Sequence, residues 1–371
     1  MKRVGVIGGG QLAWMMAPAA ARLEIALIIQ TPNATDPAVS IANETVLAPV
    51  ADVAATAELA QRSDVITFEN EFVDLPGLKQ LEAQGVRFYP ALSALQPLLD
   101  KWDQRSFLQH IGVPTPRFGA VQGDLTSEQL NAFGLPAVLK ARRLGYDGQG
   151  TIVLKHLTDL PPIGSARTAE HWLLEEFVPF DCELAMMAAR SINGEMVTYP
   201  VVETQQVNQV CQRVLVTAEV EPAVVEQMES IARLILAQLN YVGVMGIECF
   251  LTDDRQVLVN ELAPRTHNSG HYSLDACVTS QFEQQLRAVC GLPLGSPALI
   301  HAGAVMVNLL GYEAATCDYA AQRHQLSQLP NAHLYWYGKT AARPGRKLGH
   351  VTVQIHLFKS TSENQQVRIK S

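Results

Sequence analysis

Two apolar runs in the second half of the chain restrict the fold most strongly. Residues 242–251 contain one acid, Glu248, and residues 257–259 lead into Asn260 and Glu261. The polar tract 252–256 between the runs is suited to a hairpin turn. We therefore expect two antiparallel strands joined by a short turn.

The register of this hairpin decides where its two acids lie. If Thr252 pairs with Val257, Glu248 falls directly opposite Glu261. Facing carboxylates repel each other and destabilise a sheet. A divalent cation between them removes that repulsion, and Mg²⁺ favours carboxylate oxygens with substrate phosphates as further ligands. The hairpin thus predicts a metal site, and the alternative is a pair of edge-strand acids that never meet.

The loop after Glu261 is crowded with hydrogen-bond donors and ionisable groups. Such groups on a loop indicate a functional site more often than a structural one. The residues concerned are Pro264, Arg265, His267, Asn268, Ser269 and His271.

The N-terminus predicts a β-strand, a glycine turn, a helix at 12–23 and a second strand at 25–29. Gly8-x-Gly10-x-x-Ala13 fits a loose dinucleotide-binding pattern. That reading requires an acid near the end of the second strand, where this chain has Gln30-Thr31. Two interpretations remain open: a turn that binds a phosphate or another anion through backbone N–H groups, and a tight turn without a ligand.

Further strand and helix units follow, up to a strand at 87–89, and the first domain should close near residue 95. Glu69 and Glu71 come directly after a strand at 64–68. Acids at that edge of a parallel sheet either bind a ligand or cap helices on the solvated rim.

A glycine-rich loop, residues 142–150, joins strands at 137–141 and 151–155. It lacks the Gly-Lys-Ser/Thr ending of a Walker A loop, but a glycine hairpin can fold over a triphosphate. Lys140 in the first strand would add positive charge, or would simply extend from an edge strand into solvent. Glu175 and Glu176, which end a strand, predict contacts with an adenine or ribose, with surface acids as the alternative.

Downstream, the pattern predicts strands at 181–190 and 196–203, a helix at 222–239 and a helix at 280–290. A basic loop follows near the C-terminus, with Lys339, Arg343, Arg346 and Lys347 among glycine and proline. Such a loop binds an anion or is simply solvated, and the fixed shape that Gly and Pro impose favours an anion.

Length and composition narrow the classes. A chain of 371 residues suggests two or three domains. The net charge of -8 argues against sequence-independent nucleic-acid binding. The six cysteines form no CxxC pair, and no uncharged apolar run approaches the roughly 20 residues of a membrane helix. We therefore expect a cytoplasmic protein with reduced thiols and no membrane or nucleic-acid partner.

These segments resemble the ATP-grasp enzymes and, more narrowly, the ATP-dependent N5-carboxyaminoimidazole ribonucleotide synthetases of bacterial purine synthesis. The resemblance covers nearly the whole chain. The run His267-Asn268-Ser269-Gly270-His271, followed by Asp275-Ala276-Cys277 and Ser280-Gln281-Phe282-Glu283, is specific to this branch. The other matching segments are Gly8-Gly9-Gly10-Gln11-Leu12, Thr67-Phe68-Glu69, Asp100-Lys101, residues 135–140, Gly145-Tyr146-Asp147-Gly148, residues 175–180, Asn260-Glu261, Ala263-Pro264-Arg265 and Arg343-Pro344-Gly345-Arg346.

The resemblance implies an α/β ATP-grasp fold in three domains. Residues 1–95 would form an open parallel α/β domain that binds the ribonucleotide. Residues 96–290 would form the ATP-grasp domain, with a lid at about 115–180. Residues 291–371 would form a small β-rich domain that returns the basic loop to the site. The family is usually a homodimer.

The resemblance also implies a reaction. ATP would phosphorylate bicarbonate to carboxyphosphate, and the amine of aminoimidazole ribonucleotide would capture the carboxyl carbon, directly or as released CO₂. The products would be N5-carboxyaminoimidazole ribonucleotide, ADP and phosphate. ATP and two Mg²⁺ ions are the implied cofactors.

Residue roles follow from the same resemblance. Mg²⁺ would bind Glu248 and Glu261. Asp147, Arg265 and His267 would take part in catalysis. The nucleotide would contact Lys101, Lys140, Gly145, Tyr146, Asp147, Gly148, Gly150, Glu175, Glu176, Phe177, Val178, Glu183, Asn260 and Glu261. The ribonucleotide would contact Gly10, Gln11, Leu12, Glu69, Asn268, Ser269, His271, Lys339, Arg343 and Arg346.

The chain departs from the family at three places. Ala13-Trp14 stands where Gly-Arg is frequent, Gln149 where Lys or Arg is frequent, and Gln206 near a frequent histidine. Three rival functions are a sister ligase that uses formate or another acid with a ribonucleotide, a non-catalytic ATP-binding regulator, and a dinucleotide oxidoreductase.

Overall fold

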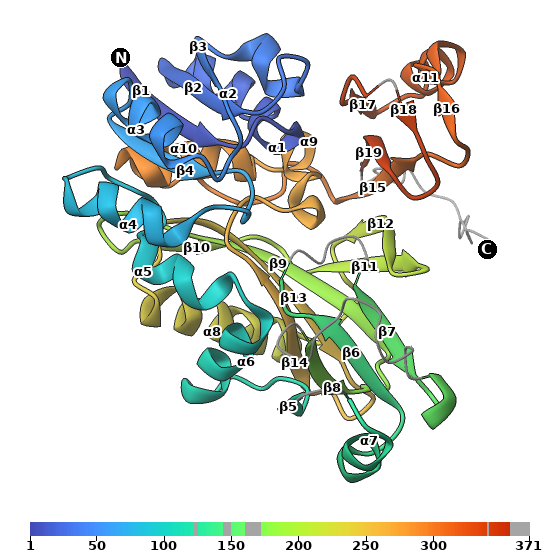
Figure 1. Ribbon diagram of the computed structural model, residues 1–371. Coiled ribbons are helices and arrows are strands. Elements are labelled where there is room, and N and C mark those ends of the chain that lie inside the picture. Colours follow the sequence, from blue (N-terminus) through green and yellow to red (C-terminus); the bar gives the residue numbers. More distant parts are fainter. Residues whose placement is uncertain (122–124, 144–149, 160–171, 340, 357–371) are drawn as a thin grey trace.

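The computed structural model describes residues 1–121, 125–143, 150–159, 172–339 and 341–356. At the N-terminus, four parallel strands form an open sheet in the order β3-β2-β1-β4 (Figure 1). This confirms the predicted open parallel domain. Its elements are β1 (Lys2–Ile7), α1 (Gln11–Trp14), α2 (Ala17–Arg22), β2 (Ile25–Thr31), β3 (Glu44–Leu47), α3 (Val53–Gln61), β4 (Val65–Phe68), α4 (Leu75–Ala83) and α5 (Leu92–Leu95).

Two predicted elements of this domain were wrong in detail. The helix expected at 12–23 is divided into α1 and α2, because Pro18 has no N–H to donate to the preceding turn and so cannot continue a helix. The strand expected at 87–89 is a single parallel bridge between Phe88 and Ile66.

A second, antiparallel sheet has the order β5-β8-β6-β7 and lies at the far end of the molecule from the N-terminal sheet (Figure 1). Most of the glycine-rich loop that joins β6 to β7 lies outside the described residues. The elements of this region are α6 (Lys101–His110), β5 (Phe118–Ala120), α7 (Ser127–Phe133), β6 (Ala137–Ala141), β7 (Thr151–Leu154) and β8 (Trp172–Glu176).

The third sheet has nine strands, eight of them in the order β14-β13-β9-β11-β12-β15-β19-β17, with β10 paired to β9. The strand predicted at 196–203 is divided into β10 and β11, since Pro200 cannot donate to a ladder. Strand β12 was not predicted. The bounds are β9 (Cys182–Arg190), β10 (Met196–Thr198), β11 (Val202–Val207), β12 (Val210–Val216), β13 (Gly243–Leu251), β14 (Val257–Ala263), β15 (Gly303–Leu310), β17 (Ala332–Trp336) and β19 (Lys347–Ile355).

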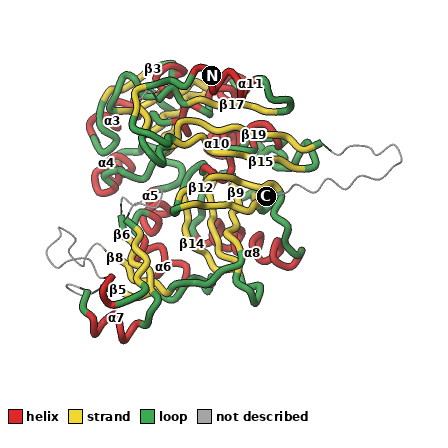
Figure 2. The backbone as a smooth tube through the Cα atoms, turned by 90° about the vertical axis from the view of Figure 1, so that its right-hand side faces the viewer, coloured by secondary structure: helices red, strands yellow, loops and turns green. Residues whose placement is uncertain are grey.

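A domain boundary was predicted at residue 290, but this sheet contains strands from both sides of that position, because β15 pairs with β12. The C-terminal strands β15, β19 and β17 therefore extend the sheet that carries β13 and β14 (Figure 2). The remaining elements are α9 (Ser273–Ala276), α10 (Gln281–Cys290), β16 (Ala315–Thr316), α11 (Ala320–Ser327) and β18 (Ala341–Ala342). Among the described residues, no helix is both long and apolar enough to span a membrane.

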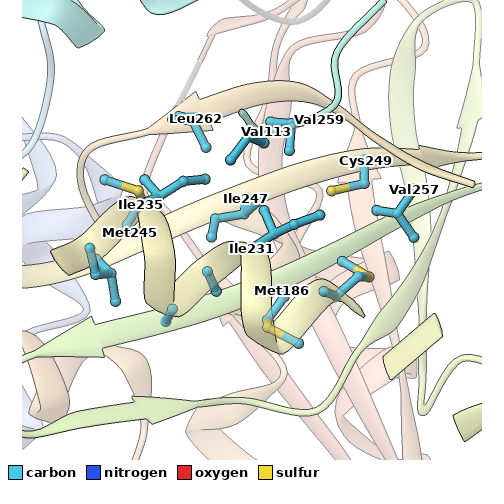
Figure 3. Packing of buried hydrophobic residues seen from close by; sticks show 14 of the residues in the cluster. Val113, Met186, Ile231, Ile235, Met245, Ile247, Cys249, Val257, Val259 and Leu262 are labelled. Carbon is cyan, nitrogen blue, oxygen red and sulfur yellow. The ribbon is translucent and has the colours of Figure 1, made fainter. Parts of the chain in front are cut away.

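The main core lies between helix α8 (Pro222–Gln238) and strands β9, β13 and β14 (Figure 3). Met228, Ile231 and Ile235 recur at helical spacing, so α8 buries one continuous apolar face against the sheet. This packing fixes the backs of β13 and β14, the two strands that carry the candidate metal ligands.

Candidate functional site

The β13–β14 hairpin pairs Glu248 with Glu261, which confirms the predicted juxtaposition. The register behind that prediction was wrong near the turn, where Leu251, rather than Thr252, pairs with Val257. That register alone would place Glu261 one residue away from Glu248. A bulge between the turn and the acids corrects the offset.

The extra residue of the bulge is Asn260. Val259 and Leu262, three positions apart, both face the core (Figure 3), whereas a regular strand would turn them to opposite faces. The bulge also allows two successive side chains, Asn260 and Glu261, to accept hydrogen bonds from lysines of one cluster. The bulge thus places two hydrogen-bond acceptors at adjacent positions on the same side of the strand.

Two lysines converge on this bulge from different elements. Lys101, the first residue of α6, places Nζ 2.6 Å from Glu261 Oε1. Lys140 of β6 donates from Nζ to Asn260 Oδ1 at 2.8 Å and lies 2.7 Å from Glu175 Oε2. The predicted phosphate-binding lysines therefore lie beside the predicted metal ligands, where a nucleotide phosphate could contact both.

The carboxylates of the hairpin differ in electrostatic environment. Burial, together with the negative charges of Glu261 and Glu183, raises the pKa of Glu248 to about 7. Burial also opposes ionisation of Glu261, but the ammonium of Lys101 reverses the effect and holds its pKa below the ordinary value. Glu248 therefore lies in an excess of negative potential that a bound cation would relieve.

Glu248 and Glu261 fit a magnesium site of the kind in which the protein supplies few ligands. Within the described ranges, no group of three or more His, Cys, Asp or Glu side chains could enclose a metal. Mg²⁺ commonly binds one or two carboxylates and completes its octahedron with water and substrate phosphate. The facing pair and the neighbouring lysines match that requirement.

Arg105 of α6 was missed by the sequence analysis. Its guanidinium donates from Nε to Glu175 Oε1 at 2.7 Å, both side chains being 2% exposed, and it also donates to the backbone oxygen of Asn260. Lys140 and Arg105 overcome the effect of burial and lower the pKa of Glu175 to about 2. A cation four positions after Lys101 shares its face of the helix, and that spacing was the available signal.

Glu175 is consequently enclosed by cations, and both of its oxygens are occupied. Its side chain connects β8 and β6 of the second sheet to α6. Any contact of this residue with adenine or ribose, as predicted, would use its backbone.

The next residues along the chain are more open. Glu176 accepts from the backbone N–H of Arg117 at 2.7 Å and is about a third exposed. Phe177 is exposed, and Val178 is buried. These positions border the junction of β8 with the third sheet, where an adenine could bind edge-on to the backbone.

Glu183 in β9 faces the same region. Burial raises its pKa to about 7, and Lys140 partly opposes this. Gln206 of β11 donates to Glu183 Oε2. The amide thus gives this carboxylate a neutral partner.

His267 lies directly beside the β13–β14 hairpin. Its Nε2 is 3.8 Å from Glu248 Oε1, and its Nδ1 is 2.9 Å from the hydroxyl of Ser269. A Cβ at Gly246 would come within 2.7 Å of the His267 Cβ, so only glycine at that position of β13 permits the approach. The imidazole therefore has Ser269 at hydrogen-bond distance on one side and Glu248 nearby on the other.

Three further polar residues of this loop, Asn268, Ser269 and His271, are buried. Asn268 and Asn308 of β15 exchange side-chain amide bonds at 2.9 and 2.8 Å. Ser269 and His271 are almost fully inaccessible, and burial holds the pKa of His271 well below its ordinary value. The side chains of these three residues form hydrogen bonds with other residues of the protein and so stabilise the conformation of the loop.

The N-terminal domain contributes Glu69 at the end of β4. Its carboxylate accepts from the Leu12 N–H at 3.3 Å, and a Cβ at Gly10 would meet Glu69 Oε1 at 2.4 Å. Gln11 begins α1 at the same turn. Burial raises the pKa of Glu69 to about 7, partly opposed by the charge of Arg265. The glycine turn therefore packs against a carboxylate that is not fully compensated.

Arg265 connects this domain to the hairpin loop. Its Nε lies 2.9 Å from Glu71 Oε1, and both side chains are about one fifth exposed. The charges of Glu71 and Glu69 raise the pKa of Arg265 despite its burial. The guanidinium therefore interacts with acids of the N-terminal domain and with Glu261 of the β13–β14 hairpin.

The basic loop reaches the same neighbourhood. The charge of Lys347 acts on both Glu248 and His271. Lys339 donates to the backbone oxygen of Lys347 at 3.0 Å, and Arg346 donates to the Ala341 oxygen at 2.6 Å. A neighbouring residue, Arg343, is exposed.

The predicted residues Gly145, Tyr146, Asp147 and Gly148 lie outside the described residues, as does Gln149 of the same loop. Gly150 is described and has φ +84°, a conformation that favours glycine. A cavity of about 740 Å³ is lined by aromatic side chains of the C-terminal region, including Tyr312, Tyr319 and Trp336, and by Pro344 and Gly345 of the basic loop.

Models of three domain families match successive parts of the chain. The ribonucleotide synthetase preATP-grasp domain matches residues 1–97, the ATP-grasp domain matches residues 106–282, and the phosphoribosylaminoimidazole carboxylase C-terminal domain matches residues 304–361. Together with the lysines and the carboxylate pair, these matches define an ATP-grasp ligase.

Individual relatives narrow the family. The N5-carboxyaminoimidazole ribonucleotide synthase of Synechococcus elongatus is 57% identical over 369 residues, 99% of this chain and 93% of the relative. The crystal structure of the synthetase from Thermotoga maritima has a TM-score of 0.85 at 38% identity, covering 96% of this chain and 94% of that one. A structure of the Aspergillus clavatus enzyme in complex with ADP and 5-aminoimidazole ribonucleotide has a TM-score of 0.85 at 30% identity, covering 95% and 94%. The chain belongs to the N5-carboxyaminoimidazole ribonucleotide synthase family.

Proposed function

We propose that this protein carboxylates 5-aminoimidazole ribonucleotide at its exocyclic amine, using ATP and bicarbonate, in purine biosynthesis. A bicarbonate oxygen attacks the γ-phosphorus of ATP and ADP leaves, giving carboxyphosphate. The amine then attacks the carboxyl carbon, directly or after release as CO₂. Phosphate leaves, the amine loses a proton, and N5-carboxyaminoimidazole ribonucleotide is formed.

The observation that carries this proposal is the convergence of Lys101, Lys140 and the Glu248–Glu261 pair on the bulged hairpin. The lysines would hold the nucleotide phosphates in line for transfer. Mg²⁺ bound by the two glutamates would neutralise phosphate charge.

The acceptor side is proposed from the residues that surround this centre. Arg265 would stabilise the anionic bicarbonate or transferring phosphate. His267, fixed beside Glu248, would orient the amine or accept its proton. Glu69 would accept from a ribonucleotide hydroxyl, and Lys339 and Arg346 would hold the ribonucleotide phosphate.

Residues 1–95, 96–290 and 291–371 would then supply the ribonucleotide, ATP and basic-loop parts of one site. The roles of Asp147 and its glycine loop remain predictions. So do the homodimer, the second Mg²⁺ ion and the cytoplasmic location.

The test is ADP release from ATP, Mg²⁺ and bicarbonate, with and without aminoimidazole ribonucleotide, and with formate in place of bicarbonate. We expect a signal that requires both the ribonucleotide and bicarbonate and that Glu261→Ala abolishes. A matched control is Glu58→Ala, which removes an exposed acid of helix α3 that belongs to neither the proposed nucleotide site nor the proposed metal pair. ADP release that requires formate would refute the proposal in favour of the sister ligase, and ATP binding without turnover would favour a regulator.

A further inference from the structure

Helix α10 carries three buried glutamines whose side chains bond to other parts of the chain. Gln284 accepts from the Gly295 N–H and donates to the Gly295 oxygen, both at 2.8 Å. Gln285 accepts from the Val244 N–H at 2.6 Å and donates to Thr67 Oγ1 at 2.8 Å. Gln281 is the third, and it is fully inaccessible. Buried amides need such partners, and these tie α10 to segments distant in sequence.

The side chain of Gln281 forms two hydrogen bonds with the backbone of one residue of the candidate site, His267. Its Oε1 accepts from the His267 N–H at 2.9 Å, and its Nε2 donates to the His267 oxygen at 2.8 Å. A backbone N–H can only donate and a backbone oxygen can only accept, so these two bonds establish which end of the amide is oxygen and which is nitrogen. One side chain therefore fixes the peptide groups on both sides of His267.

The remaining N–H of Gln281 Nε2 faces His271 Nδ1 at 3.1 Å. Because that N–H donates, Nδ1 must be the acceptor nitrogen, and neutral His271 then carries its proton on Nε2. Protonation of Nδ1 would place two donors against each other in a site with almost no solvent access. The ring packs against His350, with ring centroids 5.0 Å apart.

We propose that Gln281 is a positioning residue of the acceptor site, which holds His267 beside Glu248 and holds His271 as the neutral Nε2–H tautomer. This inference rests on the function proposed above for its kinetic consequences. The contact between His267 and Gly246 leaves the backbone little room to shift without moving the imidazole relative to Glu248.

The test compares Gln281→Glu with Gln284→Glu. Both substitutions place a carboxyl at a fully buried position of one helix, and both keep the acceptor oxygen and lose the donated bonds. Only Gln281 contacts the site. We expect kcat for ribonucleotide-dependent ADP release to fall about 100-fold in Gln281→Glu, with KM for ATP changed less than about twofold. Gln284→Glu should retain the wild-type kcat.

Equal kcat values in the two variants would overturn the proposal, whether both are active or both are impaired. A second measurement needs no variant. In ¹⁵N NMR of histidine-labelled wild-type protein, His271 should be protonated on Nε2 at neutral pH. Protonation on Nδ1 would refute the proposed role of Gln281. If wild-type protein showed no ribonucleotide-dependent ADP release, the proposed function would be refuted. The NMR result would then test by itself whether Gln281 holds His271 as the Nε2–H tautomer.

Discussion

Replacing Arg105 by Met tests whether the buried cluster behind the nucleotide site holds the fold together. The Arg105–Glu175 pair is 2% exposed on both sides, with Nε and Oε1 2.7 Å apart, and the guanidinium also donates to the Asn260 oxygen. Breaking a buried pair from one side destabilises a protein by roughly 3–5 kcal/mol, because the other charge is left uncompensated. Glu175 keeps Lys140 at 2.7 Å, so we expect a loss of about 3 kcal/mol in the free energy of unfolding, at the lower end of that range.

Arg255→Met is the matched control. Arg255 lies 3.2 Å from Asp181 and is 51% exposed, and pairs of that kind contribute less than about 1 kcal/mol. Chemical denaturation at pH 7 measures both variants. If Arg105→Met is no less stable than Arg255→Met, the reasoning about the buried cluster is refuted.

The pH dependence provides a second check on the same substitution. The pKa of Glu175 is lowered from 4.5 to about 2 in the folded protein. A lowered carboxyl pKa stabilises the fold above the unfolded-state value, and this stabilisation is lost as the pH falls toward the folded-state value. The stability difference between wild type and Arg105→Met should therefore be full above pH 4.5 and shrink below it. A difference that stays constant from pH 7 to pH 3 would contradict this origin.

Three further substitutions test the site. Burial raises the pKa of Glu69 from 4.5 to about 7, so its ionisation destabilises the fold as the pH rises through that interval. Glu69→Gln should therefore be more stable than wild type at pH 8.5, by at most about 2–3 kcal/mol, and as stable as wild type at pH 4.5. Chemical denaturation that shows no gain in stability at pH 8.5 would contradict this. Glu248→Gln should raise the Mg²⁺ concentration for half-maximal ADP release by more than about tenfold, and an unchanged Mg²⁺ titration would exclude Glu248 as a ligand. Lys339→Met should raise KM for the ribonucleotide about tenfold and leave KM for ATP unchanged, whereas steady-state kinetics with the opposite pattern would place Lys339 at the nucleotide.

The Glu248–Glu261 pairing could be predicted because alternating burial and a polar turn restrict a hairpin to few registers. The bulge could not be predicted, since its extra residue, Asn260, is polar like the residue after it. The assumed closure at Thr252 and the undetected bulge each shift the register by one residue, and the two errors cancelled. The local sequence pattern therefore predicted the correct pair of acids from an incorrect register.

Local pattern could not predict that the residues which hold the site in place are buried. Arg105 and Gln281 lie on helices, where a polar residue is ordinarily expected on the solvated face. Both are buried because partners more than 10 positions away in sequence, Glu175 and His267, satisfy their hydrogen bonds. Periodicity detects apolar burial, whereas burial of a polar group depends on a partner that the local sequence does not contain.

Three carboxylates of the site, Glu175, Glu248 and Glu69, differ in how completely neighbouring positive charges compensate them. Glu175 has two cations at hydrogen-bond distance and a pKa of about 2, so it needs nothing further. Glu248 and Glu69 are partly buried with too little positive charge nearby, and each has a pKa of about 7. A buried charge without compensation destabilises the protein unless a ligand supplies what is missing. For Glu248 we expect that ligand to be a cation. For Glu69, which faces the glycine turn, we expect a hydroxyl or amine donor. The magnesium and ribonucleotide sites should therefore lie at these two acids, with Glu175 acting only through the lysine and arginine that it holds.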